Sequence, residues 1–192
     1  MRSWAAVLSV AILAACTAAP APPPALRVVL APDLAMTLPP PSELGRELHV
    51  AHLVTARYGD RVAGFEGHID AASGHFRLAV LDPLGRKALV VDWTDADLAF
   101  DAAPWFPAGL RPQNMLADLV LIYWPPEVLQ RALRPAGFTA TAAQRSVTRD
   151  GQEIIRADFT PGPGADPIGA RVVFRNLAFG YSLDIRAAGL AP

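Results

Sequence analysis

Residues 48–93 read LHVAHLVTARYGDRVAGFEGHIDAASGHFRLAVLDPLGRKALVVDW, and this stretch decides the fold. Its turn signals are Gly59-Asp60, the segment 71–74 and Asp82-Pro83-Leu84-Gly85, which has proline and glycine where a type I turn prefers them. The segments between the turns are of strand length, and another follows at 97–101. Short strands separated by short turns predict a meander of antiparallel hairpins.

The pattern becomes helical in the middle of the chain. Pro112 stands where a helix begins, and apolar residues then recur at helical spacing: Met115, Leu116, Leu119, Val120 and Tyr123. Trp124 ends this predicted helix, and Pro125-Pro126 separates it from a second one at about 127–133. Two consecutive helices are therefore expected after the first group of strands.

Strand patterns return at 138–149, 152–160, 170–176 and 179–186. In the third of these, Val172 and Phe174 alternate with Arg171, Val173 and Arg175, which gives one apolar and one solvated face. The predicted fold class is α+β, mainly β. It is a strongly curved antiparallel sheet, a half-open β-barrel of about nine or more strands, with the two helices as a lid on its concave face.

The N-terminus has the pattern of an exported lipoprotein. Residues 1–16 read MRSWAAVLSVAILAAC, with Arg2 before a short apolar run, as in a secretory signal peptide. The run is shorter than the roughly 20 residues of a transmembrane helix. Leu13-Ala14-Ala15-Cys16 resembles the bacterial lipobox, which predicts cleavage after Ala15 and lipid attachment to Cys16. An ordinary signal peptide or a buried helix is the alternative.

Composition divides the remainder into a tether and one domain. Residues 16–41 hold eight of the 19 prolines and are interpreted as a Pro-rich tether, although Arg27–Leu30 could add a short edge strand. Residues 42–192 have the length of a single domain. The net charge of −1 and the lack of a basic cluster argue against nucleic acid as a partner.

The sequence contains no Gly-x-Ser-x-Gly, no His-Glu-x-x-His and only one cysteine, so neither an enzyme nor a cofactor is expected. Glu66 and His68 are expected on the same face of a strand. Three interpretations are open: an acid/base pair, half of a metal site, or part of a solvated sheet face. His49 and His52 are expected on opposite faces, unable to share a metal. The loop Gly162–Gly169 precedes a strand rather than a helix, so it is interpreted as a surface loop.

The more informative residues are apolar ones on the inner sheet face and on the helices. They leave two alternatives open: a filled core, or a partly open cavity for acyl chains beneath the helices. The cavity candidates are Phe65, Ile69, Phe76, Leu78, Val80, Leu116, Leu119, Tyr123, Trp124, Val172, Phe174, Tyr181 and Leu183, with Met115 beside them.

Several short motifs carry a family resemblance. Leu81–Gly85, Tyr123-Trp124-Pro125, the following Leu129 and Leu133, and the closing segment 176–185 resemble an uncharacterised bacterial lipoprotein family, domain of unknown function 3261, over roughly residues 44–188. More distantly, the order of elements is similar to the outer-membrane lipoprotein receptor LolB and its periplasmic carrier relative LolA.

The resemblance implies lipid or lipoprotein handling at the periplasmic face of the outer membrane, by a monomer held through its lipid anchor. Leu84 matches an apolar loop residue that contacts the membrane in the receptor; the alternative is a turn residue packed against its own hairpin. Thr17, in place of the aspartate that retains lipoproteins at the inner membrane, implies outer-membrane sorting. The family's frequent gene neighbours make an aryl-polyene lipid one possible cargo. A non-catalytic scaffold lipoprotein that binds a partner protein is the alternative function.

Overall fold

One curved antiparallel sheet dominates the molecule. The structure, a computed structural model, describes residues 26–106, 110–160 and 171–188. Ten strands pair in the order β7-β6-β5-β4-β3-β12-β11-β10-β9-β8. Their bounds are β3 Leu48–Tyr58, β4 Arg61–Ala72, β5 His75–Leu81, β6 Lys87–Thr94, β7 Leu98–Ala102, β8 Gly137–Ala140, β9 Gln144–Arg149, β10 Gln152–Thr160, β11 Arg171–Asn176 and β12 Tyr181–Ala188.

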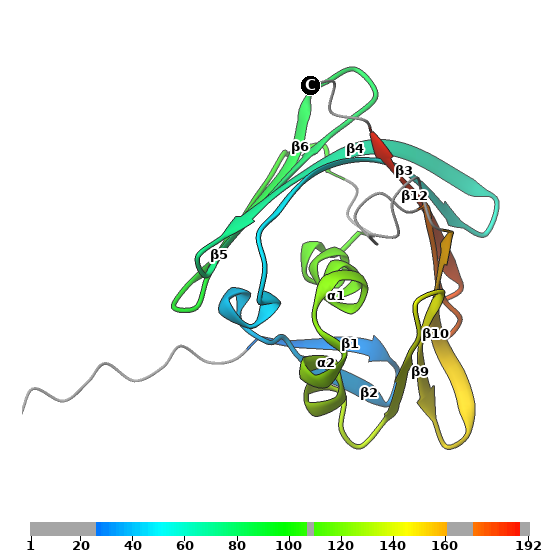
Figure 1. The fold of residues 1–192 in the computed structure, drawn as a ribbon. Coiled ribbons are helices and arrows are strands. Elements are labelled where there is room, and N and C mark those ends of the chain that lie inside the picture. The colour runs from blue at the N-terminus through cyan, green and yellow to red at the C-terminus, as the bar shows by residue number, and fades with distance from the viewer. Residues whose placement is uncertain (1–25, 107–109, 161–170, 189–192) are drawn as a thin grey trace, which may run out of the picture.

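The sheet bends around two helices, α1 (Pro112–Tyr123) and α2 (Pro126–Ala132), which lie on its concave side (Figure 1). The predicted mainly β class, the curved sheet and the two central helices are confirmed. Pro112 and Pro126 each occupy the first helical position, where a missing N–H costs nothing. The helices therefore begin where the prolines predict.

The predicted tether is too long, because its second half belongs to the domain. Strands β1 (Arg27–Ala31) and β2 (Leu34–Thr37) form a separate hairpin, and a 3-10 helix, η1 (Pro41–Leu44), follows. Val28, Leu30 and Met36 are buried. The cause of the error is that the prolines lie outside the two strands, at residue 32 in the turn between them and at residues 39–41 after them. The strand residues themselves alternate like a strand pair.

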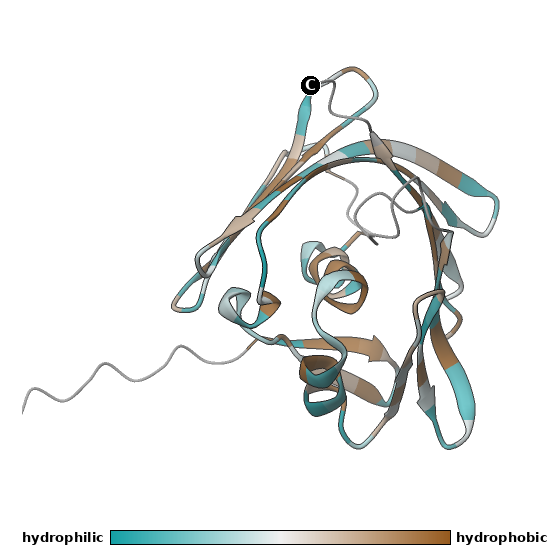
Figure 2. Cartoon of the chain, in the orientation of Figure 1, coloured by the Kyte–Doolittle hydropathy of each residue, from teal (hydrophilic) through white to brown (hydrophobic). Residues whose placement is uncertain are grey.

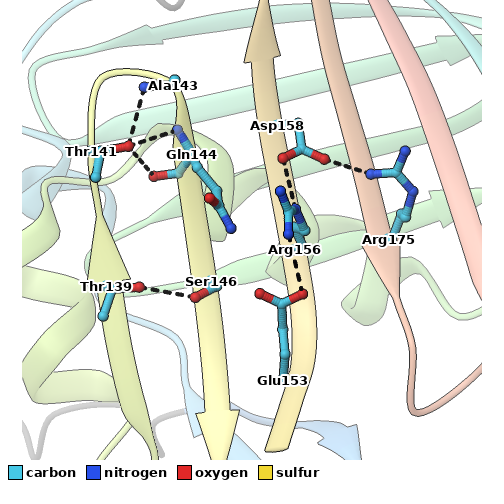
Figure 3. Close-up of polar contacts among 9 residues, drawn as sticks. All are labelled: Thr139, Thr141, Ala143, Gln144, Ser146, Glu153, Arg156, Asp158 and Arg175. Atoms are coloured by element: carbon cyan, nitrogen blue, oxygen red, sulfur yellow. Dashed lines mark hydrogen bonds and ion pairs between the residues drawn. The ribbon is translucent and has the colours of Figure 1, made fainter.

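The predicted strand at 138–149 is in fact two strands, β8 and β9, joined by a tight turn (Figure 3). The Thr141 hydroxyl accepts hydrogen bonds from the backbone N–H groups of Ala143 and Gln144, at 3.3 and 3.1 Å. A threonine side chain that bonds the backbone two and three residues later replaces the strand ladder by a turn. No glycine, proline, asparagine or aspartate marks this turn in the sequence, which is why the break was not predicted.

Aromatic rings form the centre of the core between the sheet and the helices. Trp124 follows α1 and stacks on Trp93 with a centroid separation of 5.6 Å, and Phe76 contacts both rings. Figure 2 shows that hydrophobic residues also run along β1 and β2, below the helices. The hairpin therefore closes the side of the core that the ten-stranded sheet leaves open.

Three turns of the sheet point toward the same end of its strands. Tyr58 pairs with both Arg61 and Tyr181, so the β3–β4 turn lies beside the β11–β12 turn. Leu81 at the end of β5 pairs with Glu66, which directs the β5–β6 turn to the same end. We call this end, with its β3–β4, β5–β6 and β11–β12 turns, the hairpin rim.

Candidate functional site

Most residues proposed to line an acyl cavity are buried beneath the helices. Phe76, Leu116, Trp124 and Phe174 expose no surface at all. The other buried candidates are Ile69, Leu78, Val80, Tyr123 and Val172. Side chains with almost no accessible surface leave little room for water between them, so these residues pack closely.

The sequence left open a filled core or a cavity for acyl chains, and the packing of these buried residues matches a filled core. A small space lined in part by Leu121, Phe138 and Phe174 measures about 10 Å³. That space holds at most about one water molecule. The buried candidate residues therefore pack as in a filled core in the part of the chain that the structure describes, and their binding of an acyl chain remains a prediction.

Four candidates are less buried. Phe65, Leu119, Tyr181 and Leu183 are half-buried, as is Met115 on α1. Leu183 pairs with Ala56, two residues from the end of β3, so it lies toward the hairpin rim. These side chains still pack against the core, since Leu183 pairs with the buried Phe174 and the Tyr181 ring lies 6.3 Å from the Phe174 ring.

A buried histidine links α1 to β3. The ring of His52 lies 2.7 Å, Nε2 to Oη, from the hydroxyl of Tyr123 and stacks on the Tyr123 ring. Burial lowers the pKa of His52 to about 4, because a charged imidazole loses its hydration in the core. His52 is therefore neutral at pH 7, and its face is opposite to that of the exposed His49, as predicted.

A buried carboxyl links α1 to β12. The hydroxyl of Tyr181 lies 2.8 Å from both oxygens of Asp118. Burial raises the pKa of Asp118 to about 8, although the Tyr181 hydrogen bond opposes the shift. Burial and the neighbouring carboxyl also raise the pKa of Tyr181. The Asp118 carboxyl is therefore mostly protonated at pH 7, which avoids an isolated charge in the core.

A half-buried arginine closes the C-terminal end of α1. Arg145 on β9 donates from Nη1 to the carbonyl oxygens of Leu121 and Trp124, at 2.9 and 2.8 Å. These carbonyls have no partner within the helix, and a cation suits the negative end of the helix dipole. Burial, and then the charge of Arg46, lower the pKa of Arg145 to about 10, so it keeps its charge at pH 7.

These polar contacts were not predicted, although the sequence carries a signal for two of them. His52 shares strand parity with Leu48, Val50 and Val54, so alternation places it on the apolar face. Asp118 stands among the apolar residues of the helix. The Arg145 contact has no such signal, because it depends on how β9 crosses the end of α1.

The β5–β6 turn presents an apolar side chain to solvent. Asp82 accepts hydrogen bonds at Oδ1 from the backbone N–H groups of Leu84 and Arg86 and forms an ion pair with the Arg86 side chain. Gly85 has a φ of +75°, which suits glycine. Leu84 is 79% exposed, so it is not packed against its own hairpin. The Arg86 guanidinium lies 4.8 Å from the centroid of the half-exposed Trp105 ring.

The remaining polar candidates lie on the surface or outside the described residues. Glu66 and His68 form a 2.9 Å ion pair on the convex face, both partly exposed. Within residues 26–106, 110–160 and 171–188, no group of three or more His, Cys, Asp or Glu side chains is placed to hold a metal ion. Cys16, Thr17 and the loop Gly162–Gly169 lie outside the described residues.

Comparison with known proteins identifies a family over most of the chain. The family model described as "Protein of unknown function (DUF3261)" matches residues 49–188. That range contains α1, α2 and the ten-stranded sheet except the first residue of β3. A search of curated proteins found no match. In the described part of the chain, no helix has the length and apolar character needed to span a bilayer.

Proposed function

The chain belongs to the DUF3261 family of proteins of unknown function, and from this premise we propose that it is a non-enzymatic lipoprotein of the outer membrane that binds acyl chains. It would be anchored at the periplasmic face through a lipid on Cys16 and would help to localise a lipid or another lipoprotein. The proposal treats the curved sheet as a half-open barrel of the LolA and LolB type.

One observation carries this proposal: apolar side chains on α1 and on the sheet keep part of their surface exposed. They are Leu119 and Met115 on α1 and Phe65 and Leu183 on the sheet, all half-buried and packed against the core. An acyl chain that enters from the rim would replace contacts of this kind with similar apolar contacts, at little cost in exposed surface. Deeper entry requires α1 to move away from the sheet.

The experiment uses the mature lipoprotein purified from membranes. We expect mass spectrometry to identify a co-purifying acyl lipid and a fluorescent fatty acid to bind saturably. Leu119→Asp should weaken this binding at least tenfold, because it puts a charge where the chain enters. The matched control is Leu53→Asp, since Leu53 is exposed on the convex face. Circular dichroism checks that both variants are folded.

The absence of both co-purifying lipid and saturable binding would overturn the acyl-binding proposal. It would favour the second candidate, a scaffold that binds a partner protein in an envelope complex. The filled core together with exposed apolar side chains at the rim is the observation that favours this second candidate. Equal loss of binding in Leu53→Asp would also contradict an entry site beside α1.

A further inference from the structure

We propose that the hairpin rim carries a binding site for the phosphate of an anionic phospholipid headgroup, centred on Arg57. The site lies on the convex side of β3, β12 and β11 and is separate from the space beneath the helices. It would give the domain a membrane contact of its own, in addition to the anchor on Cys16.

A surface hollow of about 330 Å³ lies between the β3–β4 and β11–β12 turns. Its lining residues are Arg57, Gly59, Arg175, Asn176, Leu177, Gly180, Tyr181 and Ser182. Arg57 pairs with Ser182, and Ser182 pairs with Arg175, so these three residues form a row across three strands. Two strand spacings separate the arginine Cα atoms by roughly 10 Å. All three residues line the hollow, and the Arg175 guanidinium is held on one side by Asp158, at 2.6 Å.

Two side chains of this row, those of Arg57 and Ser182, have hydrogen-bond donors that no described protein group accepts. Among the residues that the structure describes, the side chains of Arg57 and Ser182 have no hydrogen bond or ion pair. A guanidinium fork matches the geometry of two phosphate oxygens, and a serine hydroxyl adds a third donor. Arg57 and Ser182 therefore offer the donor set that an anion in the hollow needs.

Arginines recur on the surrounding convex face, and Figure 3 shows the ion pairs of two of them, Arg156 and Arg175. Asp158 is shared by Arg156 and Arg175, at 2.7 and 2.6 Å, while Glu153 contacts Arg156 more distantly, at 3.8 Å. The same arrangement recurs farther along the sheet, where Asp184 is shared by two arginines, Arg171 and Arg186. Asp158 and Glu153 together balance Arg156 and Arg175, whereas Asp184 leaves one of its two arginine charges uncompensated, and Arg57 adds another positive charge.

The apolar residues around the hollow select a membrane rather than a dissolved anion. Tyr58 is 62% exposed, Val62 is 58% exposed and Leu177, in the hollow itself, is 52% exposed. Leu84, at the β5–β6 turn, is a further exposed apolar side chain in a turn that points the same way, although β5 ends opposite Glu66, five residues from the start of β4. Exposed apolar and aromatic tips beside cationic side chains match the layers of a bilayer interface, where headgroup phosphates lie above acyl chains. A free phosphate would use only the cationic part of this surface.

The test uses the whole acylated protein in vesicles. Acylation consumes the one native cysteine, so Asp60→Cys at the β3–β4 turn can be labelled with an environment-sensitive dye. The label should shift to the blue in vesicles of phosphatidylcholine with phosphatidylglycerol, and much less in phosphatidylcholine alone. A label at Ala96→Cys, in the β6–β7 turn at the other end of the sheet, should not shift.

Matched arginine variants test the charge. Arg57→Gln should reduce the population in contact with anionic vesicles about fivefold, as expected for one cation near such a surface. Arg77→Gln makes the same change on the convex face of β5, where Arg77 lies between Asp70 and Asp92, and should leave contact unchanged. Added salt should weaken the contact of the unsubstituted rim.

Three results would overturn the proposal. They are an equal shift with neutral and anionic vesicles, an equal loss in Arg57→Gln and Arg77→Gln, and release of the label by inorganic phosphate beyond that caused by chloride at equal ionic strength. The last result would identify a free-phosphate site. Flotation with neutral vesicles reports the anchor and fatty-acid binding reports the interior, so failure of the proposed function is distinguished from failure of this site.

Discussion

The apolar residues beneath the helices and those at the hairpin rim are chemically alike but stand in opposite environments. Trp124 and Phe76 expose no surface, whereas Leu84 and Leu177 are largely exposed. Burial of the first group stabilises the fold. Exposure of the second group has no such benefit and leaves apolar side chains available to a partner. The apolar side chains that stabilise the fold are therefore distinct from the exposed ones that we propose to contact a membrane.

The largest effect should come from the interior. Trp124→Ala removes a fully buried ring that packs on Trp93 and Phe76, and should lower the free energy of unfolding by about 3–5 kcal/mol. Urea unfolding followed by circular dichroism measures this loss. A loss under about 1 kcal/mol would mean that the helices are weakly held. The interior would then contribute little more to stability than the exposed rim.

The interior also contains ionisable groups, which make its stability depend on pH. The pKa of Asp118 is about 8 in the folded protein and near 4 when unfolded, so the folded state binds more protons between these values. Stability from this group is fully present below about pH 4 and is lost as the pH rises toward 8. Between pH 5 and pH 8 this loss should be about 3 kcal/mol.

Asp118→Asn should remove that dependence, because the amide does not titrate and keeps an acceptor for the Tyr181 hydroxyl. Unfolding in denaturant at several pH values measures it. His52 contributes in the opposite sense: its folded pKa of about 4 lies below its unfolded value of about 6.5, so stability falls as the pH falls through this range. His52→Gln serves as the comparison. An unchanged pH profile in Asp118→Asn would contradict a protonated carboxyl in the core.

Much of the fold was predictable because its signals are local. The turns Gly59-Asp60 and Asp82–Gly85, the alternation around Val172 and the proline at position 112 gave the sheet and the helices. The packing state of the interior was not predictable, because the same apolar residues suit a filled core and a cavity. That difference is set by side-chain volumes across elements distant in sequence, as in the approach of Trp124 to Trp93.

The candidate site was also only partly predictable from the sequence. Leu84 was predicted as a loop residue, but its exposure depends on the Asp82 hydrogen bonds that build the turn. The arginine row was not predicted at all, since Arg57 and Arg175 are far apart in sequence and meet only through the register of β12. Sequence patterns show which face a residue takes, and strand pairing shows which residues it joins there.

The smallest effect on stability should come from the rim. Leu84→Ser should change the free energy of unfolding by no more than about 0.5 kcal/mol, because the side chain is already exposed in the folded state. The same variant should reduce membrane contact of the rim, measured with a dye at the β3–β4 turn. Leu53→Ser is the matched control, since it removes an equally apolar, exposed side chain from the convex face away from the turns. If both variants reduce contact equally, general surface hydrophobicity explains the binding and the rim has no special role. If Leu84→Ser lowers stability as strongly as an interior substitution, the turn supports the fold and the separation of the two surfaces fails.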